Sequence, residues 1–244
     1  MISSGGMMDD LVEDFRRRAR MPASWAMVGL IVLIHLWMRV EHSVGNGEVI
    51  YQTLGLSREG MSGMRYWQIF SHGWLHGSWV HLFVNALLVW LLGTRLELMM
   101  GSRVMLGVTA SGIVGGGVMH LLIGHDVLVG ISGGVMALLL CLASLAPDAR
   151  VLPLGISAKN LGRGVLIGEL ILALADPSLE VPVFSQIGEL LEDHGYASVF
   201  RLGHACHVGG GLVGMLIAQR WRGPRLTREK LLIEREKRER EGRA

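Results

Sequence analysis

Long apolar runs separated by charged connectors constrain this chain more than any other feature. Half of its 244 residues are hydrophobic, and a helix needs roughly 17–25 mostly apolar residues to cross a bilayer. Because a backbone in lipid must satisfy its own hydrogen bonds, such runs form membrane-spanning helices. The clearest runs are Ser24–Met38, Trp79–Leu96, Val104–Gly124, Ile131–Ala146 and Gly203–Gln219. The sequence therefore predicts an all-α integral membrane protein.

A weaker sixth run, Leu161–Ala175, contains Glu169. An intramembrane carboxyl group is a candidate for a proton or ion path, and a hydrogen bond between helices explains it equally well. With this run included the chain crosses the membrane six times. All but four of the 23 Lys and Arg residues then fall on one side. Basic loops stay in the cytoplasm, so both termini are predicted to be cytoplasmic.

The same pattern divides the chain into three parts. Residues 1–22 form a cytoplasmic N-terminal segment, residues 23–220 a six-helix membrane domain, and residues 221–244 a charged cytoplasmic tail. Basic and acidic residues alternate at helical spacing in the tail, which is typical of a solvated helix that could also touch anionic lipid. The basic excess is a topology signal, so we predict no nucleic-acid partner. The two cysteines lie within apolar runs and imply no disulfide framework.

Reactive side chains gather at one expected depth. With both termini inside, the second, fourth and sixth helices all run inward from the outer face. His81 and Asn85 lie early in the second helix, Ser132 opens the fourth, and His207 lies early in the sixth. Four residues into a helix corresponds to about 6 Å of depth. We therefore expect these polar groups to line a single water-accessible cavity that opens to the external side.

Ser132 and His207 are the residue types that nucleophilic acyl transfer requires. A serine hydroxyl becomes a nucleophile when a base within about 2.6–3.2 Å takes its proton. The developing oxyanion needs fixed donors, for which His81, Asn85 and the Ser132 amide are suitable. No acidic residue is an obvious third member, so we expect a dyad. The glycines that would let these helices approach closely are Gly130, Gly133, Gly210 and Gly214.

Three stretches of the chain resemble the rhomboid family of intramembrane serine proteases. The run from His76 to Asn85 resembles the family's HxxxxHxxxN signature. Gly130-Ile-Ser132-Gly resembles its GxSG motif, and His207 with its following glycines resembles the histidine of the sixth helix. Further matches at the end of the second helix are Gly93, Glu97, Gly101 and Ser102. Together these matches cover residues 67 to 214 in the order that the family has.

The resemblance implies a role for each matched residue. Ser132 would be the nucleophile and His207 the general base, while His81, Asn85 and the Ser132 amide would line the oxyanion hole. His76 would support the outer loop, and Glu97 would be a structural residue near the inner face. Residues with a supporting role by the same resemblance are His76, Glu97, Gly130, Gly133, Gly210 and Gly214.

The resemblance also implies the architecture and the partners. The fold would be a six-helix rhomboid-like bundle that works in the lipid bilayer without a metal or cofactor. Its substrates would be transmembrane proteins, cleaved within their membrane-spanning segments near the outer face. By resemblance alone, we expect a multi-pass protein of a bacterial inner membrane. The sequence leaves the substrate, the cleavage site and the oligomeric state open.

Two residues depart from the family's pattern. Trp67 is followed by Gln68 where the family often has Arg, which predicts a less firmly anchored first outer loop. Met136 stands where an aromatic side chain commonly packs on the catalytic histidine, so the orientation of that ring is less constrained. The acidic outer segment at residues 176–202 has no evident role.

Alternative interpretations remain beside the protease. Ten histidines would also suit a metal- or haem-binding membrane protein. A rhomboid-like protein that binds membrane clients without cutting them is a further alternative. His204, one turn before His207, competes with it for the role of base, and we favour His207 for its depth and its following glycines. The histidines expected near the outer face are His72, His76, His81, His120, His125 and His204.

Overall fold

The computed structural model describes residues 15–151 and 155–221. Most of the predicted N-terminal segment and nearly all of the predicted charged tail lie outside the described residues. The described chain is mostly helical. The helices that follow the predicted apolar runs are α2 (Pro22–Ser43), α6 (Trp79–Leu88), the π-helical turn η2 (Val89–Gly93), α7 (Thr94–Met100), α8 (Ser102–Ile123), α9 (Ser132–Leu145), α10 (Ala158–Leu174) and α12 (His204–Trp221).

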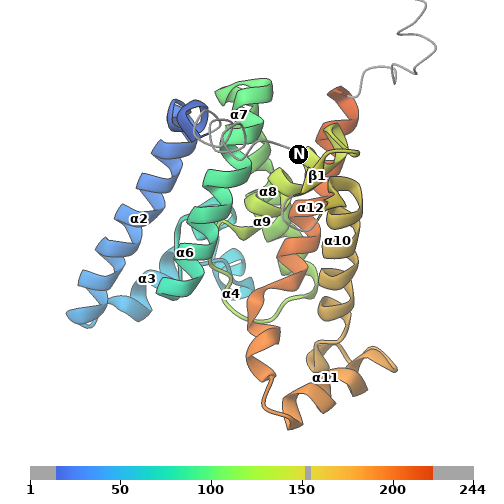
Figure 1. Ribbon diagram of the computed structural model, residues 1–244. Coiled ribbons are helices and arrows are strands. Elements are labelled where there is room, and N and C mark those ends of the chain that lie inside the picture. Colours follow the sequence, from blue (N-terminus) through green and yellow to red (C-terminus); the bar gives the residue numbers. More distant parts are fainter. Residues whose placement is uncertain (1–14, 152–154, 222–244) are drawn as a thin grey trace, which may run out of the picture.

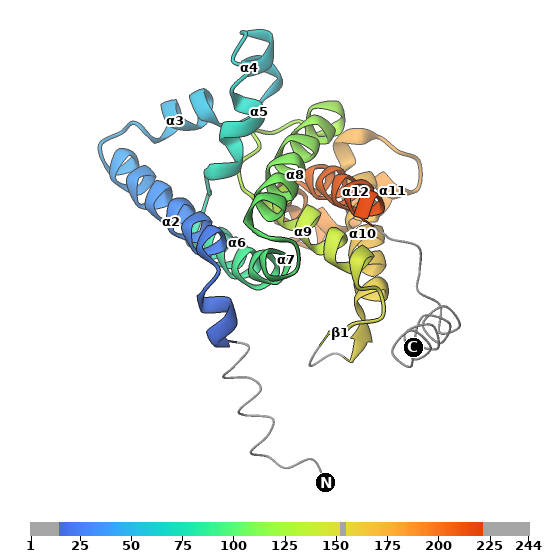
Figure 2. The ribbon, with the colours of Figure 1, turned by 90° about the horizontal axis from the view of Figure 1, so that it is seen from above.

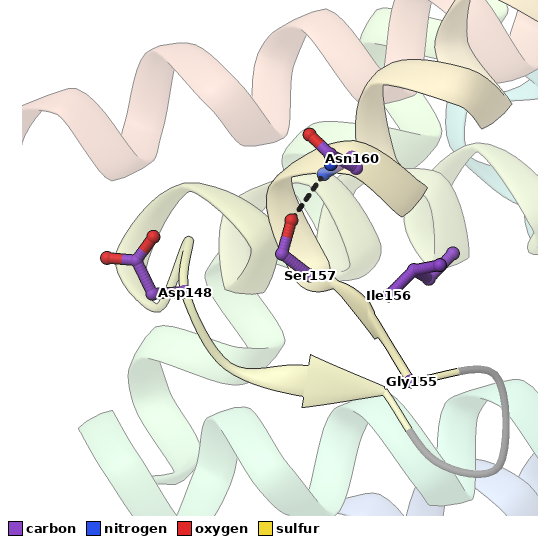
Figure 3. Close-up of a pocket in the computed structure, with 5 residues that line it drawn as sticks. All are labelled: Asp148, Gly155, Ile156, Ser157 and Asn160. Atoms are coloured by element: carbon purple, nitrogen blue, oxygen red, sulfur yellow. Dashed lines mark hydrogen bonds between the residues drawn. The ribbon is translucent and has the colours of Figure 1, made fainter.

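Shorter elements connect these helices. The first connection holds α3 (Gly47–Leu54), α4 (Arg58–Ser62), α5 (Gln68–Ser71) and the 3₁₀ turn η1 (His72–Trp74). A two-stranded antiparallel pair, β1 (Arg150–Val151) and β2 (Ile156–Ser157), precedes α10. The Ser157 hydroxyl then accepts a hydrogen bond from the Asn160 amide at 3.3 Å and caps α10 (Figure 3). The last connection holds η3 (Pro177–Leu179), α11 (Phe184–Asp193) and η4 (Ala197–Leu202).

Three helical stretches of the described chain are long and apolar enough to cross a membrane. They are Pro22–Ser43, Trp79–Met100 and Ser102–Ile123. The helix α9 is also apolar but shorter, and α10 has 17 residues. The protein is thus a mostly helical membrane protein, while the count of six crossings stays a prediction. The start of α2 and the end of α12 lie at the same end of the molecule (Figure 1).

The centre of the fold is the contact among α8, α9 and α12, which touch one another more extensively than any other helices. Figure 2 shows these three helices side by side, with α2 beyond them on one side and α10 on the other. Glycine makes this closeness possible. A Cβ atom added to Gly112 of α8 would lie 2.4 Å from the Cβ of Ala137 in α9. The core is therefore built from backbone approaching backbone, as in other membrane bundles.

Glu97 binds three helix ends together. Its buried carboxylate accepts hydrogen bonds from the backbone amides of Ala23 and Ser24, at 3.1 and 2.9 Å. The hydroxyls of Ser24 and Ser102 donate to it at 2.6 and 2.8 Å. A carboxylate at the amino end of a helix satisfies free amides and complements the helix dipole. Glu97 thus fixes the starts of α2 and α8 against α7.

The connection between α2 and α6 is firmly held, and Gln68 is the reason. Its side chain is fully buried, accepts from the Ser57 amide at 3.3 Å, and donates to the carbonyls of Gln52 and Thr53 at 2.8 and 3.3 Å. The indole of Trp67 donates to the Thr53 carbonyl at 2.8 Å. The expectation that Gln68 leaves this loop loosely anchored was therefore wrong, because its amide supplies both donors and an acceptor.

Candidate active site

The segment that leads into Ser132 is fixed to the connection between α2 and α6. Leu128 and Leu56 exchange two backbone hydrogen bonds, of 3.0 and 2.8 Å, and both side chains are buried. The Gly130 amide donates to the His72 carbonyl at 2.9 Å. These bonds set where α9 begins, and Ser132 is its first residue.

Gly130 could not readily be replaced by another residue. Its φ is +122°, a conformation that side chains rarely adopt. A Cβ atom at this position would also lie 2.7 Å from the His81 ring and 3.9 Å from the Asn85 amide nitrogen. The turn before Ser132 therefore lies directly against the two side chains predicted to line the oxyanion hole.

The helices α9 and α12 meet backbone to backbone. A Cβ atom at Gly210 would lie 2.1 Å from the Gly133 carbonyl oxygen, and one at Gly214 would lie 2.2 Å from the Ala137 carbonyl oxygen. The small-xxx-small spacing of the sequence therefore faces α9. Because this contact begins one turn after His207, it places the first turn of α12 beside the first turn of α9.

The two predicted catalytic residues lie in this junction without being bonded to each other. The Ser132 hydroxyl neighbours the thiol of Cys206, which precedes His207 in the chain. The His207 side chain is 16 % exposed, and its Nδ1 lies 2.9 Å from Glu169 Oε2. Among the described residues, Ser132 and His207 form no direct hydrogen bond with each other. The structure brings their helix ends together, and the dyad contact itself stays a prediction.

His76, His81 and Asn85 form one wall of the same region. The rings of His76 and His81 meet edge to face at 5.1 Å, and Asn85 is buried. The carbonyl of His76 accepts from Nδ1 of His35 in α2 at 3.1 Å. Burial is the main reason that the pKa of His76 is lowered to about 3, so its ring is neutral near pH 7. An uncharged His76 places no full positive charge beside His81.

Glu169 forms hydrogen bonds between helices, which confirms one of the two roles expected for it from the sequence. Its Oε2 lies 2.9 Å from His207 Nδ1 and 2.6 Å from His204 Nδ1, and its side chain is 19 % exposed. No acidic residue was an obvious third member in the sequence, and the structure places Glu169 beside the candidate base. A signal was present in the sequence: an acid lies within an apolar run, and the next long helix begins with two histidines three residues apart.

The metal alternative can be compared with the same geometry. Glu169, His204 and His207 offer ligand atoms that all lie within 4.8 Å of one another, the one such cluster in the described ranges. Of the six histidines that suggested a metal centre, this cluster includes only His204. Elsewhere, the His72 ring lies 2.9 Å from the Gln68 carbonyl and the His120 ring 2.8 Å from the Asp126 carbonyl.

Two cavities in the fold lie away from Ser132 and His207. One, of about 190 Å³, lies between α2 and α3 and reaches His76. A larger one, of about 350 Å³, lies beside the strand pair and is bordered by Asp148 and Asn160 (Figure 3). It follows the far end of α9, which at 1.5 Å per residue is about 20 Å from Ser132. The predicted water-accessible cavity around the candidate pair stays a prediction.

A family model described as the Rhomboid domain matches residues 63–222, which is more than half of the chain. No curated protein matches the chain. The matched range contains the starts of α6, α9 and α12, and with them every candidate catalytic and oxyanion residue.

Proposed function

This chain belongs to the rhomboid family, and on that premise we propose that it is an intramembrane serine endopeptidase. Ser132 is the nucleophile and His207 the general base. One observation carries the proposal: the glycine contact between α9 and α12 sets the first turns of these helices side by side, with Gly210 against Gly133. The first turns that carry Ser132 and His207, more than seventy residues apart in the sequence, thereby lie side by side, which supports the proposed pair.

The first chemical step transfers a proton and forms a bond. Ser132 Oγ attacks the carbonyl carbon of the scissile peptide while His207 takes the hydroxyl proton. The hydroxyl now neighbours the Cys206 thiol. The proposed step requires the hydroxyl to turn toward His207 about the Ser132 side-chain torsion, which has three staggered wells and can change without moving the backbone. Catalytic hydrogen bonds are often unformed until substrate binds.

The second requirement is stabilisation of the negative oxygen that this attack creates. The proposed donors are His81, the Asn85 amide and the Ser132 backbone N–H; the contact of the Gly130 turn with the first two supports this assignment. Removing one such donor typically raises the barrier by about 2.7–4 kcal/mol. His207 then returns its proton to the leaving amine, and water hydrolyses the acyl-enzyme by the same route.

The proposal includes a topology and a class of substrate. The six crossings are α2, the α6–η2–α7 stretch, α8, α9, α10 and α12, with both termini in the cytoplasm of a bacterial cell and residues 23–220 as the membrane domain. Substrates are transmembrane proteins that reach Ser132 from the lipid and are cut near the outer face. The asymmetric distribution of Lys and Arg supports this orientation.

The test is cleavage of a model transmembrane substrate by the purified protein in liposomes. Wild type is expected to cleave, and Ser132→Ala and His207→Ala are each expected to lose cleavage while keeping the thermal stability of wild type. Persistent cleavage by both variants would show that another residue performs the chemistry. A fluorophosphonate that labels wild type but not Ser132→Ala would identify the nucleophile. If wild type neither cleaves nor is labelled, the chain is a non-proteolytic client-binding member of its family.

A further inference from the structure

Glu169 holds two histidines of α12 at once. Glu169 lies five residues before the end of α10, whereas His204 and His207 lie in the first turn of α12. Both imidazoles present Nδ1 to the same carboxylate oxygen, at 2.6 and 2.9 Å. Residues three apart on a helix share one face, so a single carboxylate on α10 reaches both. The side chains of Glu169 and His207 are mostly buried, which shields the contact from water.

The contact decides which nitrogen of His207 carries the proton. A carboxylate only accepts hydrogen bonds, so His207 must donate to Glu169 from Nδ1–H. In a neutral imidazole the other nitrogen, Nε2, then carries a lone pair. A lone pair on Nε2 is what a general base needs. Glu169 thereby selects the tautomer of His207 that can accept the Ser132 proton, and its negative charge stabilises the imidazolium that results.

His204 supplies the counter-charge. Its Nδ1 faces Glu169 and its Nε2 lies 2.9 Å from the Val199 carbonyl. Both partners are acceptors, so both hydrogen bonds exist only when His204 carries two protons and a positive charge. An ionised carboxylate in a mostly buried setting is retained when it is paired and hydrogen-bonded. In that doubly protonated form, His204 is the counter-charge that keeps Glu169 ionised and available to His207.

From this geometry we propose that Glu169 is a positioning residue for the His207 base, with His204 as its counterion, so that the reaction uses Ser132, His207 and Glu169 instead of an isolated pair. This inference rests on the proposed protease function. It also gives α10 a function, because the Glu169 carboxylate connects α10 to α12 next to the proposed base. The described titratable groups around the His207 ring are Glu169 from α10, His204 and Cys206 from α12, and His81 from α6.

The kinetic test compares Glu169→Gln and Glu169→Asp with wild type in liposomes. Glu169→Gln keeps the size of the side chain but loses the charge, so kcat is expected to fall at least tenfold with KM changed less than about twofold. The acid side of the pH–rate profile is expected to move to lower pH, since His207 loses the charge that favours its protonated form. Glu169→Asp is expected to recover part of kcat. An unchanged kcat and pH profile in Glu169→Gln would overturn the proposal.

Glu97→Gln is the matched control. Glu97 is also a buried, hydrogen-bonded carboxylate, but it joins α2, α7 and α8 at the other end of the bundle. Its loss is expected to lower the thermal unfolding temperature without shifting the pH–rate profile. If Glu97→Gln shifts that profile as much as Glu169→Gln does, the effect of Glu169 is general destabilisation and the proposal is wrong.

A second measurement does not depend on activity. In protein labelled with ¹⁵N-histidine, the ring shifts of His207, assigned by their loss in His207→Ala, report its tautomer. Wild type is expected to show protonated Nδ1, and Glu169→Gln to lose that preference. If wild type cleaves nothing, this result still decides the proposal, while the missing cleavage counts against the proposed function alone. Protonated Nε2 in wild type, or stoichiometric zinc that Glu169→Gln releases, would overturn the positioning role.

Discussion

Replacing Gly210 with alanine tests whether the α9–α12 contact holds the candidate pair together. The new Cβ would lie 2.1 Å from the Gly133 carbonyl oxygen, whereas ordinary contact begins at 3.4 Å. The contacted oxygen belongs to the backbone, so it cannot move aside by a change of side-chain rotamer. The two helices must therefore separate by about 1.3 Å where they now touch. This strain is expected to lower the free energy of unfolding by about 1–3 kcal/mol.

The catalytic effect should exceed the loss of stability. Gly210 lies one turn after His207, so the separation moves the base away from Ser132. A misplacement of about 1 Å can reduce a rate by about 10²-fold. We therefore expect Gly210→Ala to lose about two orders of magnitude in kcat/KM for a transmembrane substrate in liposomes, measured at a temperature at which the variant remains folded.

Gly211→Ala provides the control on the same helix. A Cβ at Gly211 would meet Leu166 at 3.4 Å and Leu140 at 3.5 Å, which is ordinary contact with side chains. This variant is expected to keep the stability and activity of wild type, helped by the higher helix propensity of alanine. If Gly210→Ala unfolds and cleaves like Gly211→Ala, the close contact does not position His207, and the reasoning that led from it to the site is refuted.

Two further predictions concern the connection between α2 and α6. Gln68→Ala removes three hydrogen bonds from a fully buried side chain, so the free energy of unfolding is expected to fall by about 1–3 kcal/mol. The change is measured as a lower unfolding temperature. An unchanged unfolding temperature would show that other residues hold the loop. Burial lowers the pKa of His72 to about 4 and that of His76 to about 3, while both take up protons near pH 6.5 in the unfolded chain. Their stabilising contribution is therefore complete above pH 6.5 and is lost as the pH falls toward 4, by up to about 1.4 kcal/mol per pH unit for each group. Unfolding temperatures measured between pH 7.5 and 5 should show this loss, and His72→Asn should make it smaller; a slope identical to that of wild type would contradict the assignment.

The positions of the long helices could be predicted because apolar runs determine them. The run Val104–Gly124 became α8 at Ser102–Ile123, and Ile131–Ala146 became α9 at Ser132–Leu145. Even the weak run Leu161–Ala175 forms a helix, α10, since Glu169 has partners on α12 and costs little there. The short helices of the outer connections escaped prediction because they are too short to show a periodic pattern. α11 formed in a segment expected to be a loop, and the strand pair before α10 had no expected counterpart.

The parts of the candidate site that depend on helix direction and residue spacing could be predicted. Helices that run the same way place residues of similar depth together, which is why the turn at Gly130 lies against His81 and Asn85. The role of Glu169 was not predictable in the same way. It depends on how α10 is rotated about its own axis, and a sequence fixes that rotation only through the neighbours that the helix meets in space.

Two contacts on α12 therefore control different properties of His207. Gly210 and Gly214 set the distance between α12 and α9, and their spacing is visible along a single helix. Glu169 sets the orientation and tautomer of the imidazole, and it acts from another helix, 38 residues away in sequence. A general base needs both the correct distance and the correct tautomer. The motifs shared with the family include the glycines of the first contact, because these motifs lie on α6, α9 and α12. They do not include Glu169, which lies on α10.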